Sequence, residues 1–483
     1  MKRSIFSLLC LLLLAPACVK HDPQEEGPVH DALFYSNLFG YSIMRTYYLW
    51  KDEVEDALSS WTAEEDPYQK VEAVRYKDEA GNPVDRWTTL YEDYTRFLGS
   101  VTGNQKTFGL EFTAYWANSS KTRICAVVDY TYADSPAQKA GLKRGDVILT
   151  IDGEEITLTN YETLLSKLYN ADAVKLKLQR EKNSHIDLVA EEMYENPVHT
   201  VTTFTSGGTK YGYLHFTNFT LDACPDLEKA FRSFKDAGIQ ELVLDLRYNG
   251  GGYTFTSTVL ASMIAPLEAV KGKKVFNKDV YNDLLSEKYG DETCFDSSFD
   301  AATTAGTVTV KPAEVNPGIR HLWVLVSDRT ASASEALICG LKPYMDVTLV
   351  GQTTYGKFCG GNLISAKAWF EAVKKSQTGD EELDCDEGMA QIPTVGIYVI
   401  SSRYSDCNGV TLSMPSGIPA DYAATDNPGD GFDLGSPKET MLAVALAAAE
   451  GKLSTGAGAP ALRWAQPALP APVHRPGFGV LLH

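Results

Sequence analysis

Hydrophobic positions follow two different periods along this chain, and the change of period divides it into segments. Apolar residues recur at helical intervals over 31–58, and a second helical stretch covers 67–74, which together predict a small, aromatic-rich helical domain over residues 31–105. From 106 to 182, strand-like runs are separated by turn signals and short helices. Residues 183–450 alternate apolar strands with amphipathic helices, a pattern that predicts an α/β core with a mainly parallel sheet.

The two ends of the chain lack these periods. Residues 1–17 contain two basic residues, an apolar run and then small residues, and the run is too short to span a bilayer, so we expect an export signal. Residues 18–30 are polar and predict a tether. Residues 451–483 are rich in Ala, Pro and Gly and predict a low-complexity tail.

The signal raises the question of an anchor. Cys18 follows Ala-Pro-Ala and resembles the lipobox of bacterial lipoproteins, in which that cysteine carries lipid. Ordinary cleavage after Ala17 is the alternative. In either case we expect an exported protein, periplasmic or in the outer cell envelope, with a possible lipid anchor at Cys18.

Composition narrows the range of partners. The 483 residues carry a formal net charge of −19, which disfavours nucleic acid and anionic membranes because both bind basic surfaces. The sequence has no CxxC motif and no His/Cys cluster, so we expect no metal and no other cofactor.

Three loops follow three predicted strands of the core. They span residues 247–252, 327–332 and 351–357, and contain a glycine run, a serine and a lysine, respectively. If the strands are parallel neighbours, the loops emerge at the same carboxyl edge, where open α/β sheets place their sites. We therefore expect these side chains to converge.

The serine of this set suits a nucleophile. Ser332 begins a helix, where free N–H groups point outward, so the N–H of Ala333 can stabilise an oxyanion on a substrate. Gly251 or Gly252 can supply a second donor, because glycine lets the backbone approach a ligand closely.

No histidine lies in the three loops, although the chain has eight. A serine nucleophile then needs a lysine whose amine is kept neutral by burial. Lys357, in a glycine-bearing loop after a buried strand, is the candidate. A base that works at neutral pH needs the lysine pKa lowered by ~2–3 units from its usual ~10.4.

Longer motifs carry a family resemblance. Two motifs contain the candidate serine and lysine: Ala331-Ser332-Ala333-Ser334-Glu335 and Thr354-Tyr355-Gly356-Lys357. The first serine and the lysine are 25 positions apart (332 to 357). The segment LDLRYNGGG precedes these motifs in the sequence, and PSGIPADY follows them. This set resembles the C-terminal processing peptidases, or tail-specific proteases. The resemblance implies a multidomain chain with a crotonase-like core sheet and a serine endopeptidase that works through a Ser332/Lys357 dyad and an acyl-enzyme.

A second resemblance covers residues 106–182. SPAQKAGLKRGDVILTIDG closely matches the most recognisable run of PDZ domains, a β-rich fold with two helices. PDZ domains bind the C-terminal residues of a partner as an added strand. The resemblance implies protein or peptide substrates recognised by their C-terminal tails, with Phe108, Gly109 and Leu110 in the carboxylate-binding loop.

One position departs from the family pattern. Many members carry a glutamine four residues after the lysine, where it orients the amine, but this chain has Gly361. Glu335 is used as the third residue in some members and is present here, and Asn362 is a weaker candidate. The orienting residue is therefore left open.

Two rival functions follow from the same residues. The chain can be a catalytically silent, PDZ-containing relative that holds peptides, although the intact serine, lysine and glycine loop argue against it. An acyl-CoA-type enzyme on a related α/β fold explains neither the PDZ resemblance nor the serine–lysine spacing. The sequence does not give the oligomeric state.

Overall fold

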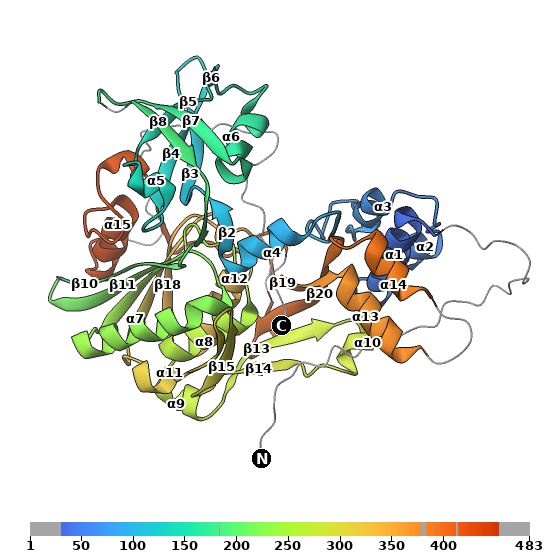
Figure 1. Cartoon of the computed structure of the whole chain (residues 1–483). Coiled ribbons are helices and arrows are strands. Elements are labelled where there is room, and N and C mark those ends of the chain that lie inside the picture. The colour runs from blue at the N-terminus through green and yellow to red at the C-terminus, as the bar shows by residue number, and fades with distance from the viewer. Residues whose placement is uncertain (1–29, 183, 378–382, 412–413, 454–483) are drawn as a thin grey trace, which may run out of the picture.

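The computed structural model describes residues 30–453, except 183, 378–382 and 412–413 (Figure 1). The predicted export signal, Cys18 and most of the predicted tail lie outside the described residues. No helix within the described ranges is long and apolar enough to cross a membrane. The seven cysteines of these ranges form no disulfide.

The centre of the core is a six-stranded sheet in the order β10-β11-β12-β17-β18-β21. The pair β10·β11 is antiparallel, and every other neighbouring pair is parallel. Its strands are β10 (Val198–Ser206), β11 (Thr209–Phe216), β12 (Glu241–Asp245), β17 (His321–Val326), β18 (Asp346–Gly351) and β21 (Tyr422–Ala423). The multidomain architecture is confirmed, whereas the likeness of this sheet to crotonase stays a prediction.

Helices cover both faces of this sheet. Alternate side chains of a strand point to opposite faces, so Leu242 and Leu244 join the cluster of one face and Val243 joins that of the other. The first face packs against α7 (Cys224–Ala237), α8 (Thr254–Ile264) and α12 (Ala333–Leu341), and the second against α15 (Thr440–Ala449). Burial on both faces explains why these strands read as continuous apolar runs.

A second sheet joins a strand of the N-terminal segment to four strands from residues 275–406. Its strands are β1 (Thr89–Tyr91), β13 (Val275–Tyr281), β14 (Glu292–Cys294), β19 (Cys359–Ser365) and β20 (Gly396–Asp406). The apolar side chains of α1 (Ala32–Tyr47) and α3 (Pro67–Val74) form one hydrophobic cluster with β19, β20 and α13 (Ala366–Ser376). Residues 31–105, predicted from sequence as a separate helical domain, therefore share their core with residues 359–400.

The third part is a six-stranded antiparallel sheet with two helices. Five of its strands follow the order β3-β4-β5-β7-β8, and the short β6 (Glu154–Glu155) pairs with β5. Its elements are β3 (Leu110–Trp116), β4 (Ile124–Thr131), α5 (Pro136–Lys139), β5 (Val147–Ile151), α6 (Tyr161–Asn170), β7 (Ala173–Leu178) and β8 (His185–Val189). This lobe lies above the core in Figure 1, with its own hydrophobic cluster. The strand β3 is at the edge of the sheet.

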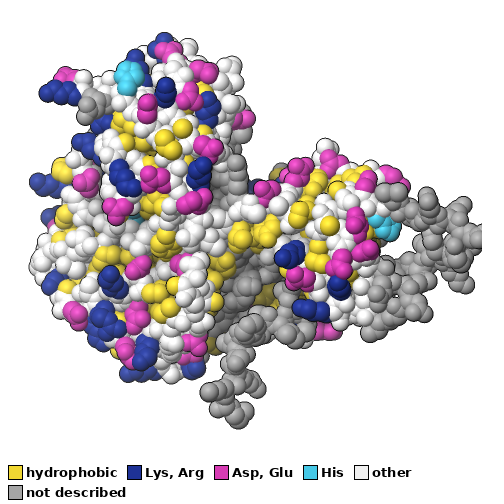
Figure 2. Space-filling view, in the orientation of Figure 1, with side chains coloured by type: hydrophobic (Ala, Val, Ile, Leu, Met, Phe, Trp, Pro, Cys, Tyr) yellow, Lys and Arg dark blue, Asp and Glu magenta, His cyan; other side chains and the backbone are white. Residues whose placement is uncertain are grey.

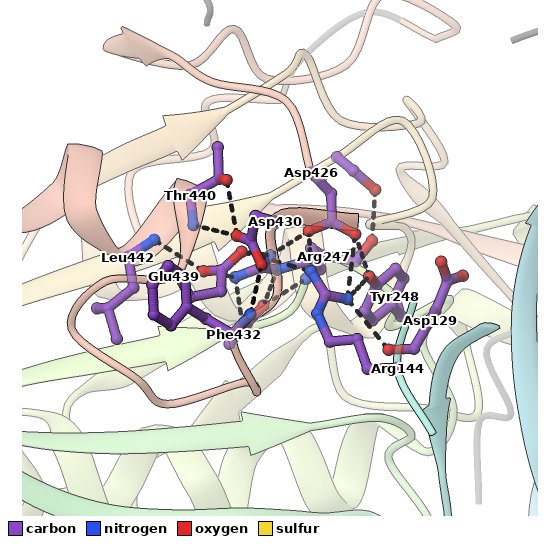
Figure 3. A network of polar contacts seen from close by, with 12 residues as sticks. Asp129, Arg144, Arg247, Tyr248, Asp426, Asp430, Phe432, Glu439, Thr440 and Leu442 are labelled. Carbon is purple, nitrogen blue, oxygen red and sulfur yellow. Dashed lines mark hydrogen bonds and ion pairs between the residues drawn. The ribbon is translucent and has the colours of Figure 1, made fainter. Parts of the chain in front are cut away.

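Buried ion pairs join this lobe to the core (Figure 3). Arg144 of the lobe contacts Asp426 at 2.6 Å, and Arg247 of the core contacts Asp426 at 2.6 Å and Glu439 at 2.7 Å. Burial acts to raise the pKa of Asp426, but Arg144 and Arg247 outweigh it and hold that pKa well below its usual range. Each charge in this network is compensated by an opposite one, as buried charges require.

A second link runs to the loop that carries Ser332. Arg329 contacts Glu111 at 2.9 Å and Asp129 at 3.0 Å, on β3 and β4 of the lobe. Basic and acidic side chains elsewhere are interspersed over the face shown in Figure 2.

Glu439→Gln should lower the free energy of unfolding by about 3 kcal/mol or more, because it leaves part of the buried Arg247 charge uncompensated. Glu228→Gln is the matched control, since Glu228 pairs with Arg232 at 3.0 Å on the surface, and it should cost no more than about 0.5 kcal/mol. Urea unfolding of the two variants measures the difference. Equal losses would show that the buried network contributes no more than a surface pair.

Candidate active site

Ser332 lies in a sharp turn between β17 and α12. Its φ is 66° and its ψ is −116°, a conformation that residues other than glycine rarely adopt. Small neighbours make the turn possible, because Ala331 and Ala333 are both buried beside it. A strained backbone held in place by its surroundings is typical of functional positions.

The glycine loop after β12 packs directly against this turn. A Cβ on Gly251 would lie 2.8 Å from the Cβ of Ser332, so only glycine fits there. Asn249 fixes the loop: its backbone oxygen accepts the N–H of Ala331, and its side chain donates to the oxygen of Phe216. The predicted meeting of the glycine run and the serine is therefore present.

Two N–H groups of this region can receive an oxyanion. Ala333 is the first residue of α12, so its N–H has no acceptor within the helix. The N–H of Gly252 has no acceptor among the described residues, whereas the N–H of Gly251 donates to Oδ1 of Asn249 at 2.9 Å. Of the two glycines named from sequence, Gly252 is the one with an available donor.

Lys357 follows β18 and is 1% exposed. Its Nζ donates to Oη of Tyr398 at 3.2 Å and lies 5.0 Å from the ring centroid of Trp87. Burial lowers the pKa of Lys357 to about 8, against the opposing effect of nearby carboxylates. This is the direction a basic amine needs to be neutral near physiological pH.

Glu335 ties the serine turn to the lysine loop. Its Oε2 accepts the N–H of Ser332 and the N–H of Lys357, both at 2.8 Å. Its Oε1 accepts the hydroxyl of Thr354 at 2.5 Å and the N–H of Gly356 at 2.8 Å. Glu335 thus positions the backbone of both residues.

Tyr404 holds the same two residues from the other side. Its hydroxyl lies 2.8 Å from the carbonyl oxygen of Ser332 and 2.5 Å from that of Lys357. Both peptide groups of the dyad are therefore fixed by shared partners. Within the described residues Oγ of Ser332 has no hydrogen-bond partner, so its bond to Nζ of Lys357 is not formed in this conformation.

Phe108, Gly109 and Leu110 lie in the lobe, at the start of its edge strand β3, and all three are buried. The N–H of Gly109 donates to Oγ1 of Thr107 at 3.0 Å. A Cβ on Gly109 would lie 2.3 Å from the Cβ of Ser135, so glycine is required at this position. The loop reaches the serine turn through Glu111 and Arg329.

Sequence reasoning did not find four residues of the site. They are Trp87, Asn249, Tyr398 and Tyr404. Asn249 stands inside the glycine run and could have been noticed as a loop-fixing side chain. The three aromatic residues come from distant segments that give no local signal.

Comparison with known proteins gives a family for the core and for the lobe. Residues 210–368 match the model of peptidase family S41, and residues 127–180 match a PDZ domain. Residues 210–368 of the core therefore form a peptidase family S41 domain. This confirms the predicted family, whose carboxyl-terminal-processing serine proteases are hydrolytic enzymes, and it confirms the PDZ domain.

The chain is similar to curated proteases. It is 25% identical over 299 residues to the carboxyl-terminal-processing protease of Synechocystis sp., covering 59% of this chain and 62% of the relative. It is 27% identical over 277 residues to the carboxy-terminal processing protease CtpB of Bacillus subtilis, covering 56% of this chain and 52% of the relative. The chain thus spans less than two thirds of the length of these relatives.

A solved structure shows the same fold. The putative S41 protease from Bacteroides fragilis matches with a TM-score of 0.62 and 21% identity, over 86% of this chain and 98% of the other.

The Nζ of Lys357 should titrate near pH 8, because burial disfavours its charged form. Three lysines with raised pKa values serve as matched controls for this titration, because each has carboxylate partners: Lys51, Lys167 and Lys374. NMR of protein labelled with ¹³C-lysine can follow the Cε shifts, and Lys357→Met assigns the resonance. A Lys357 signal that stays unchanged up to pH 10 would contradict the inferred environment.

Proposed function

We propose that this chain is an exported serine endopeptidase that recognises protein substrates by their C-terminal tails. The observation that carries the proposal is the joint fixation of Ser332 and Lys357 by Glu335, with the lysine pKa lowered by burial. A buried amine with a lowered pKa, beside a serine at a helix start, suits a Ser/Lys dyad.

In the proposed mechanism, Oγ of Ser332 rotates toward Nζ of Lys357 when substrate binds. Catalytic hydrogen bonds often form only in the substrate complex. The neutral amine takes the hydroxyl proton as Oγ attacks the peptide carbonyl. The leaving amine then receives that proton, and an ester joins the substrate to Ser332. Water, deprotonated by Lys357, attacks the ester, and the serine regains its proton.

The oxyanion of each tetrahedral intermediate is stabilised by the N–H groups of Ala333 and Gly252. Both are near the Ser332 turn, and neither has to break a hydrogen bond to the protein. Loss of one such donor typically costs about 3 kcal/mol in the transition state.

The PDZ domain delivers the substrate. Its strand β3 is the last in the order of the described sheet, the place where PDZ domains add a partner strand, and the turn of Phe108, Gly109 and Leu110 precedes it. The ion pairs of Arg329 connect the same strand to the serine turn. The signal and the cysteine that follows it support export, with a lipid anchor at Cys18 as the finer proposal.

The second candidate is a catalytically silent protein that holds peptides. Its supporting observation is the unformed bond between Ser332 and Lys357. The strained turn, the lowered lysine pKa and the available oxyanion donors favour the peptidase, because a peptide-binding surface needs none of them.

Ser332→Ala and Lys357→Ala should each lower cleavage of an unfolded protein with an apolar C-terminus by about 10³-fold or more. Lys342→Ala is the control, since Lys342 is an exposed lysine at the end of α12 and should leave cleavage unchanged. Product peptides are measured by mass spectrometry. If all four proteins bind the tail peptide and none cleaves, the silent alternative replaces the peptidase.

The wild-type kcat/KM should rise as pH increases through about 8, because only the neutral form of Lys357 accepts the serine proton. The profile is measured from pH 5.5 to 9.5 with a peptide that has no titratable side chain. A rate that is flat from pH 6 to 9 would exclude Lys357 as the base.

Replacing the substrate's C-terminal carboxylate by an amide should lower kcat/KM by about tenfold or more, because PDZ domains hold that carboxylate with backbone N–H groups. The two substrates otherwise share one sequence. Equal rates would show that the tail carboxylate is not recognised.

A further inference from the structure

The side chain of Tyr398 packs directly against the backbone of Gly361. Gly361 of β19 pairs with Ile400 of β20, and the ring of Tyr398 covers it. A Cβ on Gly361 would lie 2.8 Å from Cζ and 2.9 Å from Oη of Tyr398, and 2.5 Å from the oxygen of Val399. The tyrosine therefore occupies the space that a side chain from position 361 would need.

Tyr398 presents its hydroxyl to the lysine from this place. Its Oη lies 3.2 Å from Nζ of Lys357, and the amine lies between two aromatic rings, 4.9 Å from the centroid of Tyr398 and 5.0 Å from that of Trp87. The tyrosine is 1% exposed and packs against Phe97 with ring centroids 5.3 Å apart. The position of its hydroxyl is thus fixed by packing.

The direction of the hydrogen bond between Lys357 and Tyr398 decides whether the amine can act as a base. A neutral amine has two N–H donors and one lone pair. If Oη of Tyr398 accepts one N–H, the amine is oriented and its lone pair stays available for the proton of Ser332. If the tyrosine hydroxyl donated instead, it would occupy that lone pair.

We propose that Tyr398 is the positioning residue of Lys357, accepting an N–H of the amine and directing its lone pair toward Ser332. This proposal rests on the peptidase function proposed above. It assigns to a tyrosine on β20 the orienting task that Gly361, without a side chain, cannot perform.

Other ionisable groups lie near the amine. Asp85 and Arg86 come from the segment before β1, Glu335 from α12, and Cys359 from β19. Asp85 and Glu335 favour the charged amine, and Arg86 disfavours it. The thiol of Cys359 is neutral at the pH at which Lys357 titrates, because burial raises its pKa to about 12. Tyr398→Phe leaves all four in place and keeps the aromatic ring, so it removes only the hydroxyl.

We expect Tyr398→Phe to lower kcat by roughly tenfold to a hundredfold with KM within twofold of wild type, because the amine loses its orientation and no substrate contact changes. The acid limb of the kcat/KM profile should also move to lower pH by about half a unit or more. The hydroxyl oxygen stabilises the ammonium more than the amine, so its loss lowers the lysine pKa.

Tyr91→Phe is the matched control. Tyr91 packs on the same Phe97, with ring centroids 5.5 Å apart, and removing its hydroxyl should leave kcat and the acid limb unchanged. The concentration of active protein is fixed for each variant by titration with a serine-reactive probe. Loss of folded protein therefore does not count as loss of kcat.

Three results would overturn the positioning role. They are an unchanged kcat, a kcat that falls while the acid limb stays in place, and a kcat that rises because the tyrosine had restrained the lysine. An inert wild-type protein would instead reject the peptidase function itself, so the two failures are distinguishable.

Discussion

The site depends on one buried carboxylate. Four donors surround Glu335, and its Oε2 alone receives the backbone N–H of both Ser332 and Lys357. Burial raises the pKa of Glu335, and the hydrogen bonds oppose that rise. The four hydrogen bonds thus offset part of the free-energy cost of burying the carboxylate. Glu335 thus links the serine and the lysine, 25 residues apart in sequence, through one oxygen, and Tyr404 links their carbonyl groups from the other side.

The ion pairs between PDZ domain and core extend this constraint. Arg329 stands three residues before Ser332 and contacts strands β3 and β4 of the PDZ sheet. Arg144 enters the network of Arg247 and Asp426 beside the glycine loop. A displacement of the PDZ domain would therefore break compensated charges on both loops that form the oxyanion region. Buried charges of this kind favour discrete arrangements over gradual movement.

The sequence predicts the chemistry of the site better than its surroundings. Ser332, Lys357 and the glycine run were identified because each follows a buried strand, and parallel strands bring such loops to one edge. The sequence does not predict the roles of Tyr398, Tyr404 and Trp87. Aromatic residues usually lie in a hydrophobic core, and no local sequence feature distinguishes these three. The same holds for residues 31–105. Periodicity shows that a face of these helices is buried, but not that it packs against residues 359–400.

The core that residues 31–105 share with residues 359–400 has a consequence for how the surroundings of Lys357 form. The wall around Lys357 includes Asp85 and Trp87, translated long before it, and Tyr398, translated after it. The lysine pocket is therefore complete only when residues from both sides of Lys357 in the sequence have packed together. The burial that lowers the pKa of Lys357 is thus a property of the whole fold and of no single segment.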